Sequence, residues 1–373
     1  MRILLASPGM GLGGAERVVV SLAEGLVARG HEVAVSGAPG PLDAELPGIA
    51  RLVLPERGRN PLGAGEWVAR EAAFIRRYRP HVIHAHNAKA TAIAALAARV
   101  ARGPRRPPLL ATHHGAAQDD RAGAARLISR AADQVVVVSA DLHATFPGAL
   151  VINNGIPLAG GANARGGEDA RGDERRGGEN PHGGDDARGE GRGTKPFGAD
   201  GRPLVLFLGR LEPVKNPQRF IDVAERVPEA QFIVVGDGSL RHALRGPVTF
   251  TGARDDARAL LAQADLLLVT SDSEGQSIAV LEALAAGTPV VSTPVPGMAE
   301  LDGVTVATFD PEDLARATRE LLHDPVRRHR LGRAGARLVR ERFSADYMVT
   351  AYERAYHALT IGTQCSSTSS SPS

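Results

Sequence analysis

Glu274 and Glu282 have the sequence surroundings that most strongly indicate chemistry. Glu274 follows the apolar run Leu266–Val269, a predicted strand, and α/β folds bind ligands at the carboxyl ends of their strands. The turn that follows leads into a helix, where unpaired first-turn amides suit a phosphate group. The turn consists of Gly275, Gln276, Ser277 and Ile278. Glu282 stands in the apolar run of that helix, where a carboxylate usually has a hydrogen-bonding role.

These surroundings predict that Glu274 accepts hydrogen bonds from sugar hydroxyls and that Glu282 reaches a ribose. The simpler alternative makes Glu274 a capping acid and Glu282 a solvated helix residue.

Two cations, Arg210 and Lys215, follow an earlier strand of the same half. The strand pattern Leu204–Leu208 ends at Gly209, which lets a ligand approach the backbone. Two positive side chains at one strand end could neutralise a diphosphate that departs without a metal ion. Taken alone, they are more simply explained as surface ion-pairing residues.

Glycine-rich turns follow two further strands. One comprises Gly236, Asp237 and Gly238, whose backbone could hydrogen-bond a nucleobase, although a tight turn explains it equally well. The other, Gly9-Met10-Gly11-Leu12-Gly13-Gly14, opens a helix and matches the G-x-G-x-x-G pattern of dinucleotide-binding proteins. The next strand ends without an acid that could bind a ribose, so a nicotinamide-dependent dehydrogenase is the weaker interpretation.

Histidines gather at two other predicted strand ends. They are His84, His86, His113 and His114. A metal site is one interpretation, but no cysteine or acid stands beside them, and Asp119 and Asp120 lie further along the chain. We expect no metal, and a histidine at a strand end could instead contact a sugar.

Composition limits the class of protein. Apolar residues make up 43% and charged residues 23% of the 373, which is typical of a soluble globular chain. The net charge of +2 argues against a dedicated nucleic-acid binder. The single cysteine, Cys365, and the absence of a leader pattern or a membrane span predict a cytoplasmic protein.

Basic residues outnumber acidic ones in residues 1–157. Solvated helix ends are the simpler explanation, and peripheral contact with an anionic membrane is the other. Much of the excess lies at Arg76, Arg77, Arg79, Arg99, Arg102, Arg105 and Arg106.

Apolar runs alternate with amphipathic stretches along both halves, which predicts two doubly wound α/β domains of Rossmann-like type facing each other across a cleft. Further strands are expected at Arg2–Ser7, Glu32–Gly37, Arg51–Leu54, Val82–His86, Leu109–His113, Val135–Ser139, Val151–Asn153, Gln231–Val235, Val248–Thr251, Pro289–Ser292 and Val304–Thr308. Helices are expected at Ala15–Ala28, Glu66–Arg77, Lys89–Arg99, Glu312–Leu322, Val326–Arg342 and Asp346–Leu359, with another starting at Asn216-Pro217.

A stretch between the two halves breaks the alternation. Residues 159–195 contain no Val, Ile, Leu or Phe and are rich in Gly, Arg, Asp and Glu, a composition typical of disorder. We therefore predict a first domain at 1–157, a disordered linker at 158–200, a second domain at 201–343, a last helix at 344–360 and a disordered tail at 361–373.

Together these motifs resemble the retaining glycosyltransferases of family 4 (group 1), which have the GT-B architecture. The resemblance covers most of the chain outside the linker and the tail. It rests on Gly13-Gly14-Ala15-Glu16-Arg17-Val18, Thr112-His113-His114-Gly115, Asn154-Gly155-Ile156, Gly209-Arg210-Leu211 with Lys215, Gly236-Asp237-Gly238, and Glu274 with Glu282 followed by Ala283-Leu284-Ala285-Ala286-Gly287-Thr288-Pro289.

The resemblance implies a role for each of these sites. Arg210 and Lys215 would bind the donor diphosphate, Glu274 the donor sugar and Glu282 the ribose. Gly14 would approach the phosphates, and His114 would contact the sugar or assist the reaction. It also implies that the last helix crosses back onto the first domain.

The implied reaction moves a sugar from a nucleotide-diphosphate sugar, UDP- or GDP-linked, to a hydroxyl acceptor with retention of configuration. It needs no cofactor and no metal, because the departing phosphate accepts the proton. An envelope polysaccharide, a glycolipid or another lipid-linked acceptor is favoured over a small metabolite, while the sugar, nucleotide and linkage stay open. The alternative from another class is a GT-B protein that binds sugar nucleotides without catalysis.

Overall fold

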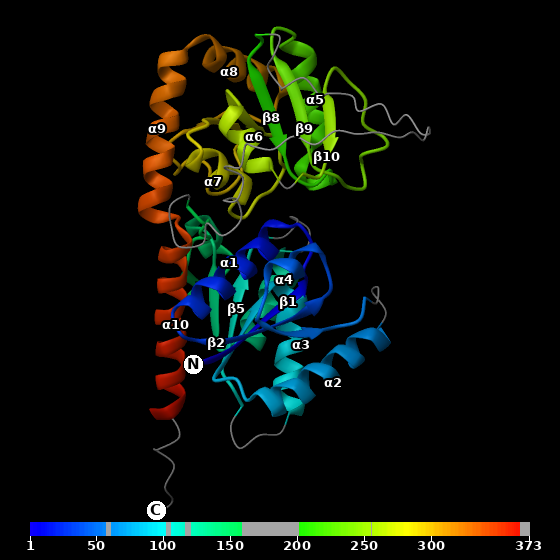
Figure 1. Ribbon diagram of the computed structural model, residues 1–373, viewed down its shortest axis with the longest axis vertical. Helices are drawn as coiled ribbons and strands as arrows, with labels where there is room; N and C mark the ends of the chain where they lie inside the picture. Colours follow the sequence, from blue (N-terminus) through cyan, green and yellow to red (C-terminus); the bar gives the residue numbers. More distant parts are fainter. Residues whose placement is uncertain (57–60, 102–105, 116–120, 159–200, 255, 366–373) are drawn as a thin grey trace, which may run out of the picture.

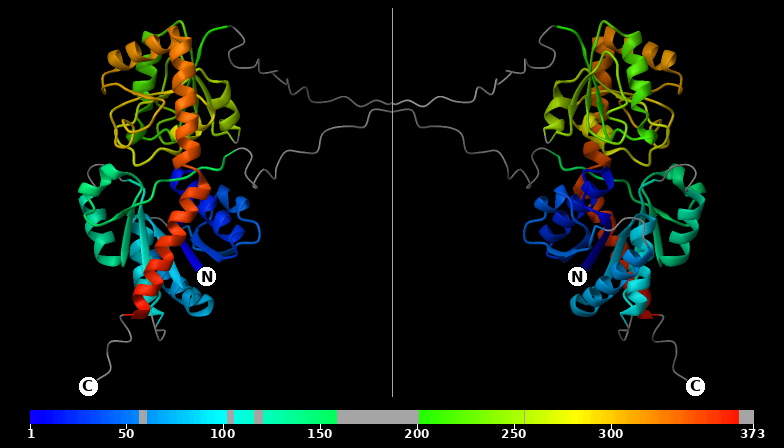
Figure 2. Two further views of the ribbon diagram at one scale, coloured as in Figure 1. Left: turned by 90° about the vertical axis from the view of Figure 1, so that its left-hand side faces the viewer. Right: turned by 90° about the vertical axis from the view of Figure 1, so that its right-hand side faces the viewer.

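The computed structural model describes residues 1–373 except 57–60, 102–105, 116–120, 159–200, 255 and 366–373. The predicted disorder of the linker and of the tail from residue 366 therefore falls outside the described residues. Two α/β domains lie one above the other, and two helices that are consecutive in the chain run along both of them (Figures 1 and 2).

The first domain has a parallel sheet of seven strands in the order β3-β2-β1-β4-β5-β6-β7. These strands are β1 (Arg2–Gly9), β2 (Glu32–Ala38), β3 (Ala50–Val53), β4 (Val82–His86), β5 (Leu109–His113), β6 (Gln134–Val137) and β7 (Leu150–Val151). The order reverses between β1 and β4. Doubly wound sheets bind ligands at such a reversal, so β1 and β4 mark the expected site of this domain.

Helices cover both faces of this sheet because alternate residues of β1 point to opposite sides. Ile3 and Leu5 pack in one apolar cluster with α1 (Gly14–Ala28), whereas Leu4 and Ala6 pack in another with α2 (Pro61–Tyr78) and α3 (Asn87–Val100). The described residues of this domain also form α4 (Arg121–Ala131) and the short 3₁₀ helices η1 (Pro41–Glu45) and η3 (Ala140–Ala144).

The second domain repeats the design with a six-stranded parallel sheet in the order β10-β9-β8-β11-β12-β13. Its strands are β8 (Leu204–Leu208), β9 (Gln231–Val235), β10 (Thr249–Gly252), β11 (Leu266–Val269), β12 (Val290–Ser292) and β13 (Val304–Val306). Its helices are η4 (Pro213–Lys215), α5 (Pro217–Arg226), α6 (Ala257–Gln263), α7 (Ile278–Ala285), α8 (Pro311–His323) and α9 (Pro325–Arg342). The order reverses between β8 and β11, the two strands that precede Arg210 and Glu274. The prediction of two Rossmann-like domains is confirmed.

The last helix, α10 (Ala345–Cys365), continues the line of α9 and packs against α1 of the first domain (Figure 2). Glu353 of α10 accepts hydrogen bonds from Arg29 (2.9 Å) and from the His31 ring (2.7 Å). The helix is longer than predicted, because residues 361–365 are helical rather than part of a tail. A helix that is already anchored extends at little cost, and residues 361–365 contain no proline to stop it.

A buried carboxyl group, that of Glu71 on α2, makes the stability of the first domain depend on pH between about 4.5 and 8. Its side chain is 1% exposed, and burial raises its pKa to about 8, while a hydrogen bond from Ser36 acts in the opposite direction. Since the pKa in the unfolded chain lies near 4.5, the unfolded state releases its proton first as the pH rises. The contribution of Glu71 to stability is therefore greatest below pH 4.5 and is lost as the pH rises towards 8.

We predict that Glu71→Gln removes this loss. The wild type should lose about 3 kcal/mol of unfolding free energy from this group between pH 5 and pH 8, and the variant should not. Urea unfolding of both proteins at the two pH values measures the difference. Parallel pH profiles for the two proteins would contradict the assignment.

Candidate functional site

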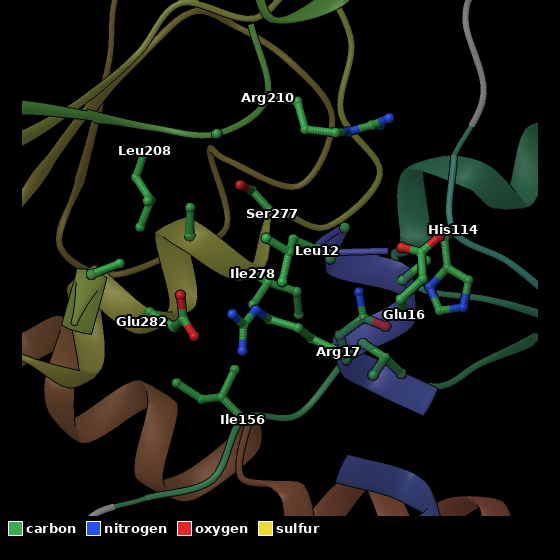
Figure 3. Close-up of a pocket in the computed structure, with 18 of the residues that line it drawn as sticks. Leu12, Glu16, Arg17, His114, Ile156, Leu208, Arg210, Ser277, Ile278 and Glu282 are labelled. Carbon is green, nitrogen blue, oxygen red and sulfur yellow. The ribbon is translucent and has the colours of Figure 1, made fainter. Parts of the chain in front are cut away.

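The reversal points of the two sheets face each other across a cavity of about 700 Å³ (Figure 3). Its walls come from the β1–α1 turn, from the segments after β4, β5, β8 and β9, and from the loops into α6 and α7. The predicted site residues that line it are Gly14, His114, Gly209, Arg210, Lys215, Gly236, Asp237, Glu274, Gly275, Gln276, Ser277, Ile278 and Glu282.

Gly238 is the predicted site residue that does not line this cavity. A side chain there would lie only 2.6–2.8 Å from the backbone of Leu211, and the Gly238 amide donates to the Asp237 carboxylate. Gly238 is thus held by packing against the segment after β8, and close backbone packing explains why this position is a glycine.

Lys215 and Glu274 form a close ion pair in the part of the wall that the second domain provides. The ammonium group lies 2.5 Å from Glu274 Oε1, and Ser271 Oγ donates to the same oxygen at 2.7 Å. The Glu274 side chain is 9% exposed and that of Lys215 is 22% exposed. A cation and a carboxylate are therefore fixed together at the ends of β8 and β11.

Arg210 extends from the segment after β8 into the cavity, opposite the start of α1 (Figure 3). The charge of Arg210 acts on the carboxyl group of Glu16 in the first domain, a cavity residue that sequence reasoning had not assigned to the site. Burial raises the pKa of Glu16, while its own backbone amide and the charge of Arg210 oppose that rise. An acid in the first turn of the helix after a glycine-rich turn is the signal that could have identified it.

The N-terminus of α7 enters the cavity without a side-chain cap. Ser277 is the N-cap residue and its hydroxyl makes no capping hydrogen bond. The first amides of a helix have no acceptor within the helix, and they carry partial positive charge. Gly14 at the start of α1 approaches this end closely, because a side chain at Gly14 would lie 3.2 Å from Ile278.

Glu282 is the fifth residue of α7, and its side chain is 9% exposed. Its carboxylate accepts a hydrogen bond from Arg258 of α6 at 2.9 Å. Arg17 of α1 extends across the cavity in the direction of Glu282 (Figure 3). Both arginines line the cavity, and no spacing in the sequence had singled out Arg258.

Three of the four histidines, His84, His86 and His114, come together beneath the first-domain wall, whereas the ring of His113 packs against that of Phe146. His84 contacts Tyr356 and Thr112 through its two ring nitrogens, each at 2.7 Å, and His86 Nδ1 lies 2.9 Å from His114 Nε2. Burial lowers the pKa of His84 and His86 well below the usual value, and that of His114 to about 3. The rings are therefore neutral, and His114 is the one that reaches the cavity.

Asp119 and Asp120, the acids considered as partners of the histidines, lie outside the described residues. Among the residues that the structure describes, no group of three or more His, Cys, Asp or Glu side chains could hold a metal ion.

Two family profiles match the chain, one on each domain. Residues 12–158 match the profile described as Glycosyltransferase Family 4, and residues 202–324 match that described as Glycosyl transferases group 1. The chain belongs to glycosyltransferase family 4. The resemblance inferred from the motifs is thereby confirmed.

Curated members of the family match this chain over part of their own length. It is 32% identical over 152 residues to the sulfoquinovosyl transferase SQD2 of Arabidopsis thaliana, which covers 37% of this chain and 30% of that protein. It is 32% identical over 164 residues to the lipopolysaccharide core biosynthesis glycosyltransferase LpsE of Rhizobium meliloti, covering 40% and 48%. The match thus spans less than half of each of these relatives.

Solved structures show the fold. HepE from Anabaena in complex with UDP-glucose superposes with a TM-score of 0.74 over 96% of this chain and 100% of that chain, at 22% identity. WaaG, a glycosyltransferase involved in lipopolysaccharide biosynthesis, superposes with a TM-score of 0.66 over 96% and 99%, at 17% identity. This family member therefore has the GT-B fold that the motifs imply.

Proposed function

We propose that this family 4 member transfers a sugar, with retention of configuration, from a nucleotide-diphosphate sugar to a hydroxyl acceptor. One observation carries the proposal: Arg210, Lys215 and the uncapped end of α7 all converge on one cavity beside the paired Glu274. Two cations and a set of free amides suit a diphosphate, and a buried carboxylate beside them suits sugar hydroxyls.

Each of these residues of the second domain would bind a different part of the donor. Arg210 and Lys215 would stabilise the departing diphosphate, and Glu274 would hold the sugar. Glu282 would release Arg258 and bind the ribose. Because the cations and amides are fixed before the reaction, they would stabilise the developing charge without reorganisation.

The residues of the first domain would complete the reaction centre. His114 would contact the transferred sugar as a neutral imidazole, and Gly14 would let the backbone approach the phosphates. The acceptor would attack on the face from which the diphosphate departs, and the departing phosphate oxygen would accept its proton. Leaving-group stabilisation in this proposal requires no bound metal and no cofactor.

A UDP- or GDP-sugar donor and an envelope polysaccharide or glycolipid acceptor are the substrates that we favour. A relative 31% identical over 182 residues is described as a GDP-mannose-dependent phosphatidylinositol dimannoside mannosyltransferase, and the HepE structures contain UDP. A small-metabolite acceptor is the alternative, since another relative, 29% identical, is an alpha-D-kanosaminyltransferase.

The test is a calorimetric binding screen against UDP-, GDP-, ADP- and TDP-sugars, followed by measurement of donor hydrolysis. We expect one of these donors to bind and to be slowly hydrolysed, and Glu274→Ala to abolish hydrolysis while the protein stays folded. Binding without hydrolysis would favour a non-catalytic sugar-nucleotide-binding protein. Binding of a nicotinamide dinucleotide in place of all four donors would refute the assignment.

The outer surface of the first domain supports a peripheral contact with anionic lipid on the cytoplasmic face of a membrane. No described helix is long and apolar enough to span a bilayer. Leu96 and Val100 on α3 are each 50% exposed, and Leu127 on the adjacent α4 is 39% exposed. The arginines beside them in sequence, Arg99, Arg126 and Arg130, are exposed as well.

We expect the protein to co-sediment with vesicles that contain phosphatidylglycerol and not with phosphatidylcholine vesicles. Replacing Arg99, Arg126 and Arg130 by serine should weaken vesicle binding about 100-fold, at about 1 kcal/mol for each basic group. A matched variant replaces three exposed arginines of α9, Arg330, Arg333 and Arg337, and should bind as the wild type does. Equal loss in both variants would point to net charge rather than to this surface.

A further inference from the structure

A buried cluster of polar rings lies behind His114, between the first sheet and α10. His84 and His86 share the face of β4 that packs against α10, because residues two apart in a strand point to the same side. Tyr352 and Tyr356 share one face of α10, because they are four positions apart in a helix. All four of these residues are 0% exposed. Buried polar groups require partners, so the contacts of each ring bear on what the cluster does.

His86 directs its hydrogen bond at His114. His86 Nδ1 lies 2.9 Å from His114 Nε2, and the two rings are nearly parallel, with an interplanar angle of 15°. The other ring nitrogen of His86 is buried and has no hydrogen-bond partner among the described residues. An apolar side chain would fill this space without leaving a buried nitrogen unpaired, so packing alone does not explain a histidine here. The bond to His114 does explain it.

Two tyrosines of α10 hold the next ring, that of His84. His84 Nδ1 lies 2.7 Å from Tyr356 Oη, and His84 Nε2 lies 2.7 Å from Thr112 Oγ1. Thr112 Oγ1 lies 3.0 Å from Tyr352 Oη. Because both of its nitrogens are bonded, the ring of His84 is fixed in its plane. It packs against the ring of His86 with the centroids 4.2 Å apart, and so it limits the rotation of His86.

We propose that His86 is a positioning residue that fixes the ring of His114 at the cavity, and that the tyrosines of α10 hold His86 in place through His84. The proposal rests on the proposed function, in which His114 contacts the transferred sugar. α10 continues the line of α9 from the second domain but packs on the first domain (Figure 2). The last helix therefore supplies hydroxyl groups that orient a residue of the cavity from behind.

Nuclear magnetic resonance tests the cluster without an activity measurement. We expect the imidazole ¹⁵N signals of His114, assigned with a His114→Ala variant, to shift in Tyr356→Phe, which removes a single hydroxyl group. Tyr347→Phe is the matched control, because Tyr347 stands on the same helix and is 54% exposed, and it should leave these signals unchanged. Signals of His114 that stay unchanged in Tyr356→Phe would overturn the proposal.

Steady-state kinetics separate positioning from support of the fold. His86→Leu should lower kcat about 10- to 100-fold, because a displacement of about 1 Å can cost 100-fold, and should change the dissociation constant of the nucleoside diphosphate less than about threefold. In the His114→Ala background the same change should cost less than about twofold, because the ring that His86 positions is gone. Equal losses in the two backgrounds would overturn the proposal, since His86 would then act only on the fold.

Two milder variants keep the test valid if His86→Leu fails to fold. His86→Asn places an amide where the imidazole Nδ1 lies and can keep the bond to His114, so it should retain kcat within about fivefold. Tyr356→Phe should lower kcat about two- to fivefold, and Tyr347→Phe should not lower it. Wild-type kcat in Tyr356→Phe would contradict the role of α10. Absence of nucleotide binding in the wild type would refute the proposed function, whereas the resonance measurement tests the cluster on its own.

Discussion

Lys215→Ala should lower the rate of sugar transfer about 100- to 1,000-fold. Removal of a single preorganised group that stabilises developing charge typically costs this much. Lys215 is the cation closest to Glu274, and its side chain is 22% exposed, so water can replace it only in part. Without it, the departing diphosphate would keep only Arg210 and the α7 amides, and the carboxylate of Glu274 would lose its counter-charge.

Steady-state kinetics with the donor identified in the screen measure this effect, and thermal unfolding verifies that the variant is folded. The matched control is Arg226→Ala, which removes an exposed cation of the same domain, paired with the exposed Glu312. Arg226→Ala should transfer sugar at the wild-type rate. Retention of more than about a third of the activity in Lys215→Ala would exclude it as a diphosphate ligand.

Gly275→Ala should lower the rate of transfer about 100-fold or more while the nucleotide still binds. A methyl group at Gly275 would overlap the carbonyl oxygen of His114 and lie 3.2 Å from the amide of Gly115. From the other side, Gly115 has φ +104, and a side chain there would lie 3.0 Å from the amide of Gly275. Both neighbours are backbone, so no rotamer change can relieve the contact, and the loops of the two domains must separate.

Separation by about 1 Å would move His114 away from Glu274, and we expect a loss of about 100-fold or more in kcat. The dissociation constant of the nucleoside diphosphate should change little, because Arg210, Lys215 and Glu282 all belong to the second domain. The control is Gly11→Ala in the glycine-rich turn, where an added side chain would meet nothing within 4 Å. Full transfer activity in Gly275→Ala would show that the domains need not meet at this point.

Local patterns in the sequence determined the strands and the positions of most site residues. Apolar runs such as Leu204–Leu208 and Leu266–Val269 form strands with the predicted bounds, because a strand buried on both faces has few other arrangements. Ligands bind at the carboxyl ends of parallel strands, so the sequence predicted that Arg210 and Glu274 share one site, and both line the cavity. The order of the family motifs along the chain also indicated which residues belong to the site.

The tertiary structure decided which residues face one another across the domains. Asn154 and Gln276 are 122 positions apart, and His84 and Tyr356 are 272 apart, so no periodicity links them. Arg258 meets Glu282 only because α6 packs against α7, and Gly238 lies outside the cavity only because the backbone of Leu211 lies so close. Secondary structure follows from local patterns along the chain, whereas these contacts depend on how the two sheets and their connecting helices pack together.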